Sequence, residues 1–208
     1  MALHDSMSAP QPTPSPRGWH ERAPQLTDGV VTLRTLRSAD APSLVAHLND
    51  PRVAEYIAPA PSSPEAFRRF IRWTHAERRR RGFTCLGVVP PGGNQPAGVI
   101  QVWPIERDFS TAEWGFALGT ALWGTGLFAR AATLFLDAVF ADLGVYRLEA
   151  RAVDINMRGN RVFEQLGATR EGVLRGGFRD GEVFRDHVMW SILAPEWRAR
   201  RAEAHRAN

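Results

Sequence analysis

The segment Thr111–Leu143, TAEWGFALGTALWGTGLFARAATLFLDAVFADL, predicts a strand, a glycine-rich loop and a helix that begins at about Leu127. The loop is the stretch Trp123–Gly126. The first N–H groups of a helix have no partner within the chain, and the helix dipole places partial positive charge there. Glycines also allow a ligand to approach the backbone closely. We therefore expect an anionic group to bind at Gly124–Phe128.

The elements around this segment predict an α/β fold with a mixed sheet. Short β-branched or alternating runs indicate strands at 30–36, 83–89, 97–105, 111–118, 146–153, 173–178 and 183–193. Apolar stripes at helical spacing indicate helices around 44–48, 65–81, 127–143 and 154–166. Turn residues at 90–96 and at Asp180-Gly181 predict two hairpins. We expect the helices to pack on the faces of the sheet.

The chain length of 208 residues favours a single domain. Residues 1–25 are rich in Pro, Ser and Ala and lack periodicity, which predicts a disordered arm. The domain itself is expected at 26–195. Residues 196–208 are expected to form a tail with a short surface helix.

Composition excludes several classes of protein. No apolar run approaches the roughly 20 residues that span a bilayer, and the N-terminus has no secretory signal pattern, so we expect a cytoplasmic protein. The single cysteine, Cys85, allows no internal disulfide and no paired-cysteine metal motif. All 26 basic residues are Arg, yet the net charge is only +4, which does not favour dedicated nucleic-acid binding. The His residues show no metal spacing, and no metal is expected.

Three stretches resemble the GNAT acetyltransferases, and in particular the branch that acetylates the N-termini of ribosomal proteins. They are VTLRTLRSADAPSLVAHLNDPRV at 31–53, AEWGFAL followed by ALWGTG at 112–126, and DINMRGNRVFEQLGATREGVLRGGFRDGEVFRDHVMWSIL at 154–193. The last stretch is the most specific. The resemblance implies a mostly antiparallel twisted sheet, helices on both faces, and a central V-shaped splay that takes acetyl-CoA as co-substrate.

The resemblance also implies which residues contact the cofactor. The family's pyrophosphate loop is matched by Gly124 and Gly126, although Ala121 replaces its usual Gln or Arg. Phe163 stands where many relatives have a Tyr that acts as the general acid. The expected cofactor contacts are Ala117, Leu118, Trp123, Gly124, Thr125, Gly126, Leu127, Phe128, Asn156 and Phe163.

Acyl transfer to an amine needs a base for the amine proton and a donor for the carbonyl oxygen. Glu113 is the candidate base, acting through water, and the alternative is a surface Glu without a role. Glu149 and Asp154 are the other candidates. Gly115 is expected to mark a bulge that frees an N–H group for the carbonyl oxygen. Because Cys85 is expected to be a buried apolar residue, direct transfer is favoured over an acyl-cysteine intermediate.

The favoured acceptor is a primary amine at a protein N-terminus, which would make a ribosomal protein a partner. Two alternatives stay open. One is acetylation of a small amine such as an antibiotic or polyamine, which an acidic pocket would favour. The other is a non-catalytic acyl-CoA-binding module, because Phe163 and Gly159 replace residues that donate protons in many relatives. Pairing into a homodimer is also left open.

Overall fold

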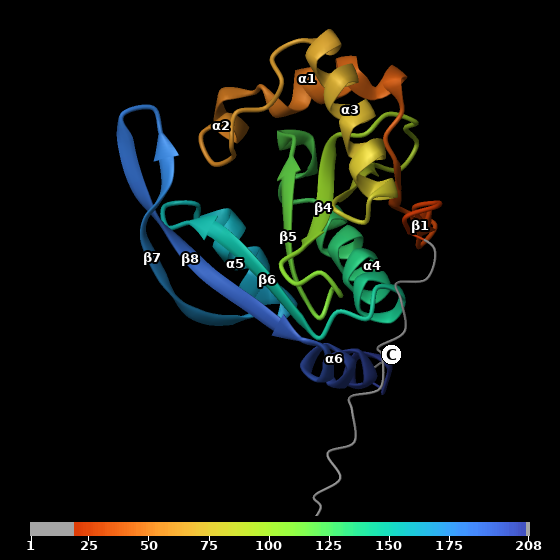
Figure 1. Ribbon diagram of the computed structural model, residues 1–208, viewed down its shortest axis with the longest axis vertical. Coiled ribbons are helices and arrows are strands. Elements are labelled where there is room, and N and C mark those ends of the chain that lie inside the picture. Colours follow the sequence, from red (N-terminus) through yellow and green to blue (C-terminus); the bar gives the residue numbers. More distant parts are fainter. Residues whose placement is uncertain (1–18, 207–208) are drawn as a thin grey trace, which may run out of the picture.

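In the computed structural model, which describes residues 19–206, the chain forms an eight-stranded sheet with helices on both faces (Figure 1). The strand order is β1-β2-β3-β4-β5-β6-β8-β7. The strands are β1 Leu26–Thr27, β2 Thr32–Thr35, β3 Thr84–Val89, β4 Gly98–Pro104, β5 Thr111–Leu118, β6 Arg147–Val153, β7 Thr169–Asp180 and β8 Val183–Leu193. The helices are α1 Ala41–Leu48, α2 Pro51–Ala54, α3 Pro64–Arg79, α4 Leu127–Asp142, α5 Met157–Leu166 and α6 Ala194–Arg206, with 3₁₀ turns at Ser38–Asp40 and Thr120–Leu122.

Alternation along the strands divides the core between two faces of the sheet. On β5, Ala112 and Trp114 belong to the larger cluster, which includes Phe135 and Leu136 of α4. Ala117 faces the smaller cluster, which is built on α1 and α3. Phe135 and Leu136 are fully buried, and each contributes about 1.5–3 kcal/mol relative to an exposed side chain.

The helix ends follow their local sequence. Ser63 caps α3 by accepting a hydrogen bond from the Ala66 N–H at 3.2 Å. Gly167 ends α5 in the left-handed region with φ 82°. Helix α4 begins at Leu127, as its sequence predicts.

The functional geometry begins between β5 and β6, which are the only parallel neighbours among the described strands. Their pairing covers three rungs and ends at Glu113 opposite Glu149. Beyond that rung the two strands diverge, and they open upward as a V (Figure 1). The splay that the family resemblance implied is therefore present.

Gly115 does not form the expected bulge. The register between β4 and β5 runs without a shift from Gly98 opposite Leu118 to Pro104 opposite Ala112. The loss of β6 as a neighbour, and not a bulge, leaves the edge of β5 unpaired. Irregular pairing occurs elsewhere, between β7 and β8.

The N-terminal arm is only partly within the described residues, since residues 1–18 lie outside them. The remainder of the expected arm is packed, because Trp19 is 4% exposed and its Nε1–H donates to Asp142 at 3.1 Å. Arg78 of α3 also donates to the Trp19 carbonyl at 2.8 Å. The packed chain therefore starts before residue 26. At the other end, Trp197 buries α6 against the larger cluster.

Candidate functional site

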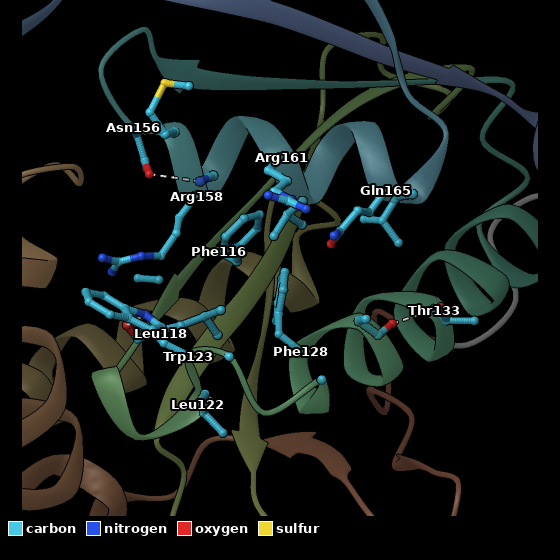
Figure 2. Close-up of a pocket in the computed structure, with 18 of the residues that line it drawn as sticks. Phe116, Leu118, Leu122, Trp123, Phe128, Thr133, Asn156, Arg158, Arg161 and Gln165 are labelled. Carbon is cyan, nitrogen blue, oxygen red and sulfur yellow. Dashed lines mark hydrogen bonds between the residues drawn. The ribbon is translucent and has the colours of Figure 1, made fainter.

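A cleft of 720 Å³ lies at the splay between β5 and β6. One wall is the end of β5 with the following loop and the start of α4, and the opposite wall is α5 (Figure 2). Of the expected cofactor contacts, those that line the cleft are Ala117, Leu118, Trp123, Gly124, Gly126, Phe128 and Asn156. The loop and strand predicted from Thr111–Leu143 are thus brought together with α5 around one cavity.

The glycine loop presents bare backbone to this cleft. Gly124 and Gly126 have φ angles of 69° and 74°, a region that side chains rarely adopt, and nothing lies within 4 Å of a Cβ placed on either. Gly126 is the N-cap of α4 and supplies no side chain to cap it. The Leu127 N–H donates to the Thr125 hydroxyl, and the N–H groups that follow it in the first turn of α4 are available to an anion.

The unpaired edge of β5 faces the same cleft. The Gly119 N–H donates to the Ala97 carbonyl next to β4, so by alternation Leu118 and Phe116 direct their backbone groups away from β4 and into the gap. The Leu118 carbonyl accepts a hydrogen bond from Trp123 Nε1–H at 3.2 Å. The N–H groups of Phe116 and Leu118 thus form the polar edge of an otherwise largely apolar wall.

Asn156 has two roles at the mouth of the cleft. Its Oδ1 accepts the Gly159 N–H at 2.9 Å and caps α5, and the residue also lines the cavity. Gly159 is required for this arrangement, since a Cβ there would lie 2.7 Å from Asn156 Nδ2.

Arginines line the cleft from two helices. Arg158 of α5 crosses to the loop and stacks its guanidinium 4.0 Å from the centre of the Trp123 ring. Arg161 of α5 and Arg200 of α6 line it as well. These residues make the cleft electropositive, as an anionic ligand requires. The family resemblance pointed to none of them, although the Arg-rich tail was visible in the sequence.

Three expected contacts do not line the cleft. The Thr125 hydroxyl donates to the Leu122 carbonyl and accepts the Leu127 N–H, so it shapes the loop from within. Leu127 packs against the larger core cluster. Phe163 is 2% exposed and packs edge-on against Trp114, because its ring points into the core and not into the cavity.

Phe128 lines the cleft beside Phe116. Its ring centre lies 4.3 Å from that of Phe116, so the two rings pack together across the cavity floor (Figure 2). Phe116 in turn packs on Phe163 at 5.6 Å. These aromatic rings therefore join the wall of the cleft to the larger core cluster.

Glu113 stands at the vertex of the V, on the sheet face opposite to α4. Its side chain is 13% exposed and forms an ion pair with Arg151 at 3.4 Å. Burial raises the pKa of Glu113 above its ordinary value, and the neighbouring Glu149 carboxylate adds to the rise. Arg151 and a hydrogen bond from Trp103 act in the opposite direction. Glu113 does not line the cleft itself, and it lies at the sheet position where the opening starts.

The alternative base candidates are placed less favourably. Glu149 is held by Arg147 at 2.9 Å. The Asp154 carboxylate accepts the Ile155 N–H at 2.8 Å in the turn before α5. Both are engaged in local structure.

Tyr56 is a lining residue that sequence reasoning missed. It follows α2 and lines the cleft together with Val53 and Ile57. Burial and a hydrogen bond to Glu55 raise the pKa of the phenol, so it stays protonated at neutral pH. The sequence offered one indication of Tyr56, because the chain has only two tyrosines that could act as a phenolic proton donor.

The described residues do not support a cysteine nucleophile, a metal site or a membrane-spanning helix. Burial raises the pKa of the Cys85 thiol to about 12, which keeps it protonated. Among residues 19–206 there is no group of three His, Cys, Asp or Glu side chains placed to hold a metal. In the same part of the chain, no helix is both long enough and apolar enough to traverse a bilayer.

Comparison with known proteins identifies the family. Residues 31–169 match the acetyltransferase (GNAT) domain. A probable N-acetyltransferase of Bacillus subtilis, YjcK, is 30% identical over 112 residues, which span 53% of this chain and 62% of that protein. The ribosomal protein uS5-alanine N-acetyltransferase of Escherichia coli is 24% identical over 113 residues, or 54% of this chain and 58% of that enzyme. The crystal structure of a presumed acetyltransferase from T. thermophilus superposes with a TM-score of 0.72 at 32% identity, covering 87% of this chain and 96% of that one.

Proposed function

Because the chain belongs to the GNAT acetyltransferases, we propose that it transfers the acetyl group of acetyl-CoA to a primary amine. One observation carries the proposal: β5 loses its β6 neighbour beyond Glu113, and a 720 Å³ cleft with a bare glycine loop opens at that point. The loop suits the pyrophosphate of CoA, because N–H groups and positive dipole meet there. Arg158, Arg161 and Arg200 supply positive charge along the cleft.

The chemistry needs three events, and each has a candidate group. Glu113 takes the amine proton through water, and its raised pKa brings it closer to the operating pH of a base. The neutral amine nitrogen then forms its bond to the thioester carbonyl carbon, and its second proton leaves to water. The N–H of Phe116 or Leu118 donates to the carbonyl oxygen as that atom gains charge.

The bond from carbon to sulfur breaks last, and the thiolate leaves with the electron pair. Tyr56 is positioned on the cleft to protonate it, a role that Phe163 cannot fill because it has no hydroxyl and is buried. The products are an N-acetyl amide and the free CoA thiol. Direct transfer is favoured because Cys85 stays protonated in the core.

The favoured acceptor is a protein N-terminus, with a ribosomal protein as the candidate partner. The support is the similarity to the uS5-alanine enzyme and the charge at the vertex. There the carboxylates of Glu113, Glu149 and Glu171 face the guanidiniums of Arg147 and Arg151, and these five groups together have one net negative charge. This balance suits a single ammonium better than a polyamine.

The test is thiol release with acetyl-CoA and a panel of peptides with free N-termini, with spermidine as the polyamine control. We expect CoA thiol and acetylated peptide to appear in equal amounts. A protein that binds acetyl-CoA tightly and yet releases no thiol with any amine would instead be a binding module, the function that the absence of a hydroxyl at Phe163 favours.

A further inference from the structure

A second hollow lies on the opposite face of the sheet from α4, outside the cofactor cleft. It has a volume of 370 Å³ and is lined by Trp73, Glu77, Gly82, Phe83, Gln101 and Trp103. Trp73 is 47% exposed, which is unusual for a large aromatic side chain on a surface that no described residue covers. Such an exposed aromatic group indicates a binding surface.

The aromatic walls of this hollow support one another. Phe70 stacks on Trp73 with ring centres 5.8 Å apart, and Trp73 packs on Phe83 at 5.0 Å. Phe83 stacks on Trp103 at 5.9 Å with an interplanar angle of 21°. The rings are therefore held in place before any ligand arrives, which lowers the entropy cost of binding.

The hollow shares a sheet face with the candidate base. Trp103 is the cross-strand partner of Glu113, and Glu113 is the partner of Glu149. The Trp103 side chain lowers the pKa of Glu113, and its six-membered ring lies 3.6 Å from the position of a Cβ on Gly115. The Trp103 and Gln101 side chains thus cover Gly115, and Trp103 extends from the hollow to the vertex.

The distances between the strands determine which residue of a bound peptide can reach the hollow. Neighbouring strands are about 4.8 Å apart, so Trp103 and Phe83 lie roughly 5 and 10 Å from the strand of Glu113. An extended peptide advances about 3.4 Å per residue. With its amine at Glu113, a peptide places the side chain of its second or third residue over the hollow.

We infer that this aromatic hollow binds an aromatic or bulky apolar side chain at the second or third position of a peptide acceptor. The inference rests on the proposed function, because it places the acceptor amine at Glu113. Charge complementarity selects this occupant, since the vertex has one net negative charge for the ammonium while Glu77, at the rim of the hollow, is already paired with Arg80 at 2.8 Å. A second copy of the chain and residues 1–18 are the competing occupants.

The experiment compares peptides that begin with Ser and carry Phe, Leu, Gly or Asp at positions two and three. Wild type is compared with Trp73→Ala, and Phe184→Ala serves as control because Phe184 is 66% exposed at the β7–β8 hairpin. We expect kcat/KM of wild type to be highest for Phe. Trp73→Ala lowers the value for the Phe peptide about tenfold, and by much less for the Gly peptide. Phe184→Ala should leave kcat/KM unchanged for both the Phe and the Gly peptide.

Three results would overturn the inference. One is equal kcat/KM for all four peptides in wild type. A second is a dimer in sedimentation that Trp73→Ala dissociates, which would assign the hollow to a second copy. The third is a rise in kcat/KM for the Phe peptide when residues 2–18 are deleted, which would assign it to that segment. Acetylation without any side-chain preference removes only this inference, whereas no acetylation of any peptide removes the proposed function.

Discussion

Glu113 of β5 lies opposite Glu149 of β6 in the last rung before these two strands diverge. Two carboxylates thus meet at the point where the sheet opens, and Arg151 pairs with Glu113 at 3.4 Å. The arrangement holds a largely buried acid with a raised pKa where the cleft begins to open. This arrangement is the structural basis for the expected effect of replacing Glu113 and for the expected pH dependence of activity.

Replacement of Glu113 tests the base directly. We expect Glu113→Gln to lower kcat by about 10²–10⁴-fold, the usual contribution of general-base catalysis, and to leave the Kd of acetyl-CoA unchanged. Stopped-flow thiol release and calorimetric binding would measure the two quantities. Glu106→Gln, at an exposed Glu in the turn before β5, is the matched control. Full turnover in Glu113→Gln would refute the assignment.

The pH dependence of activity follows from the neighbours of Glu113. Because Glu113 must be ionised to accept a proton, kcat/KM should rise with pH through its raised pKa. Removal of a cation raises that pKa further, so Arg151→Gln should move the acid limb to higher pH. Glu149→Gln removes a like charge and should move it to lower pH. Shifts in the same direction would show that another group controls the limb.

The glycine loop predicts a specific loss of cofactor affinity. Gly126→Ala forces a side chain into the left-handed region at φ 74°, which costs about 1–2 kcal/mol, and places a methyl group at the anion site. We expect weaker binding of acetyl-CoA together with a lower Tm. Gly92→Ala has nearly the same strain, with φ 72° in the β3–β4 turn, and should lower Tm alone. Equal affinities in the two variants would count against the loop as the pyrophosphate site.

Gly159 links the cap of α5 to the cleft. Gly159→Ser places a Cβ 2.7 Å from Asn156 Nδ2, so the Asn156 side chain must leave its capping position. Loss of the cap should destabilise the fold by about 1 kcal/mol and change the Kd of acetyl-CoA. Gly172→Ser, where the added Cβ meets nothing within 4 Å, is the control for denaturant unfolding and for binding. The idea fails if Gly159→Ser matches the control in both.

Low pH should weaken the ion pair between Glu171 and Arg147 beside the vertex. Hydrogen bonds from Arg147 and from the Ser191 hydroxyl hold the pKa of Glu171 at about 2, below its ordinary value of 4.5. A lowered pKa contributes stability that is present above about pH 4.5 and is lost as the pH falls toward 2. The Tm of wild type should therefore exceed that of Glu171→Gln at pH 6, and the gap should shrink by pH 3. A constant gap would mean that the contact acts through packing and not through charge.

Local sequence predicted much of the fold because its elements are specified by neighbouring residues. The strand at Thr111–Leu118 and the start of α4 at Leu127 follow from alternation and from the glycine loop before the helix. The edges were less accurate: β7 begins at Thr169 and not at 173, and β1 was not expected. β1 has only two residues and pairs with β2 at Leu33 and Thr32, so it is too short to show an alternating pattern in the sequence.

Seven of the ten expected cofactor contacts line the cleft, and their contact with the cofactor stays a prediction. Phe163 was expected in the cleft on the strength of its position in the family pattern, but its ring turns into the core against Trp114. Tyr56 and Arg200 were not expected there because α2 and α6 reach the cleft only through tertiary packing. Trp19 likewise appeared to belong to a disordered arm, yet it is buried and donates a hydrogen bond to Asp142, 123 residues away.

The sequence by itself determined the strand, loop and helix at Thr111–Leu143, since glycine conformation, strand alternation and helix-start chemistry are local properties. Only the tertiary structure decided that β6 runs parallel to β5 for three rungs and then leaves it. It also decided that Glu113 faces away from α4, on the same side as the aromatic hollow. Those facts depend on contacts between residues far apart in the chain, where the balance of packing and backbone pairing sets the geometry.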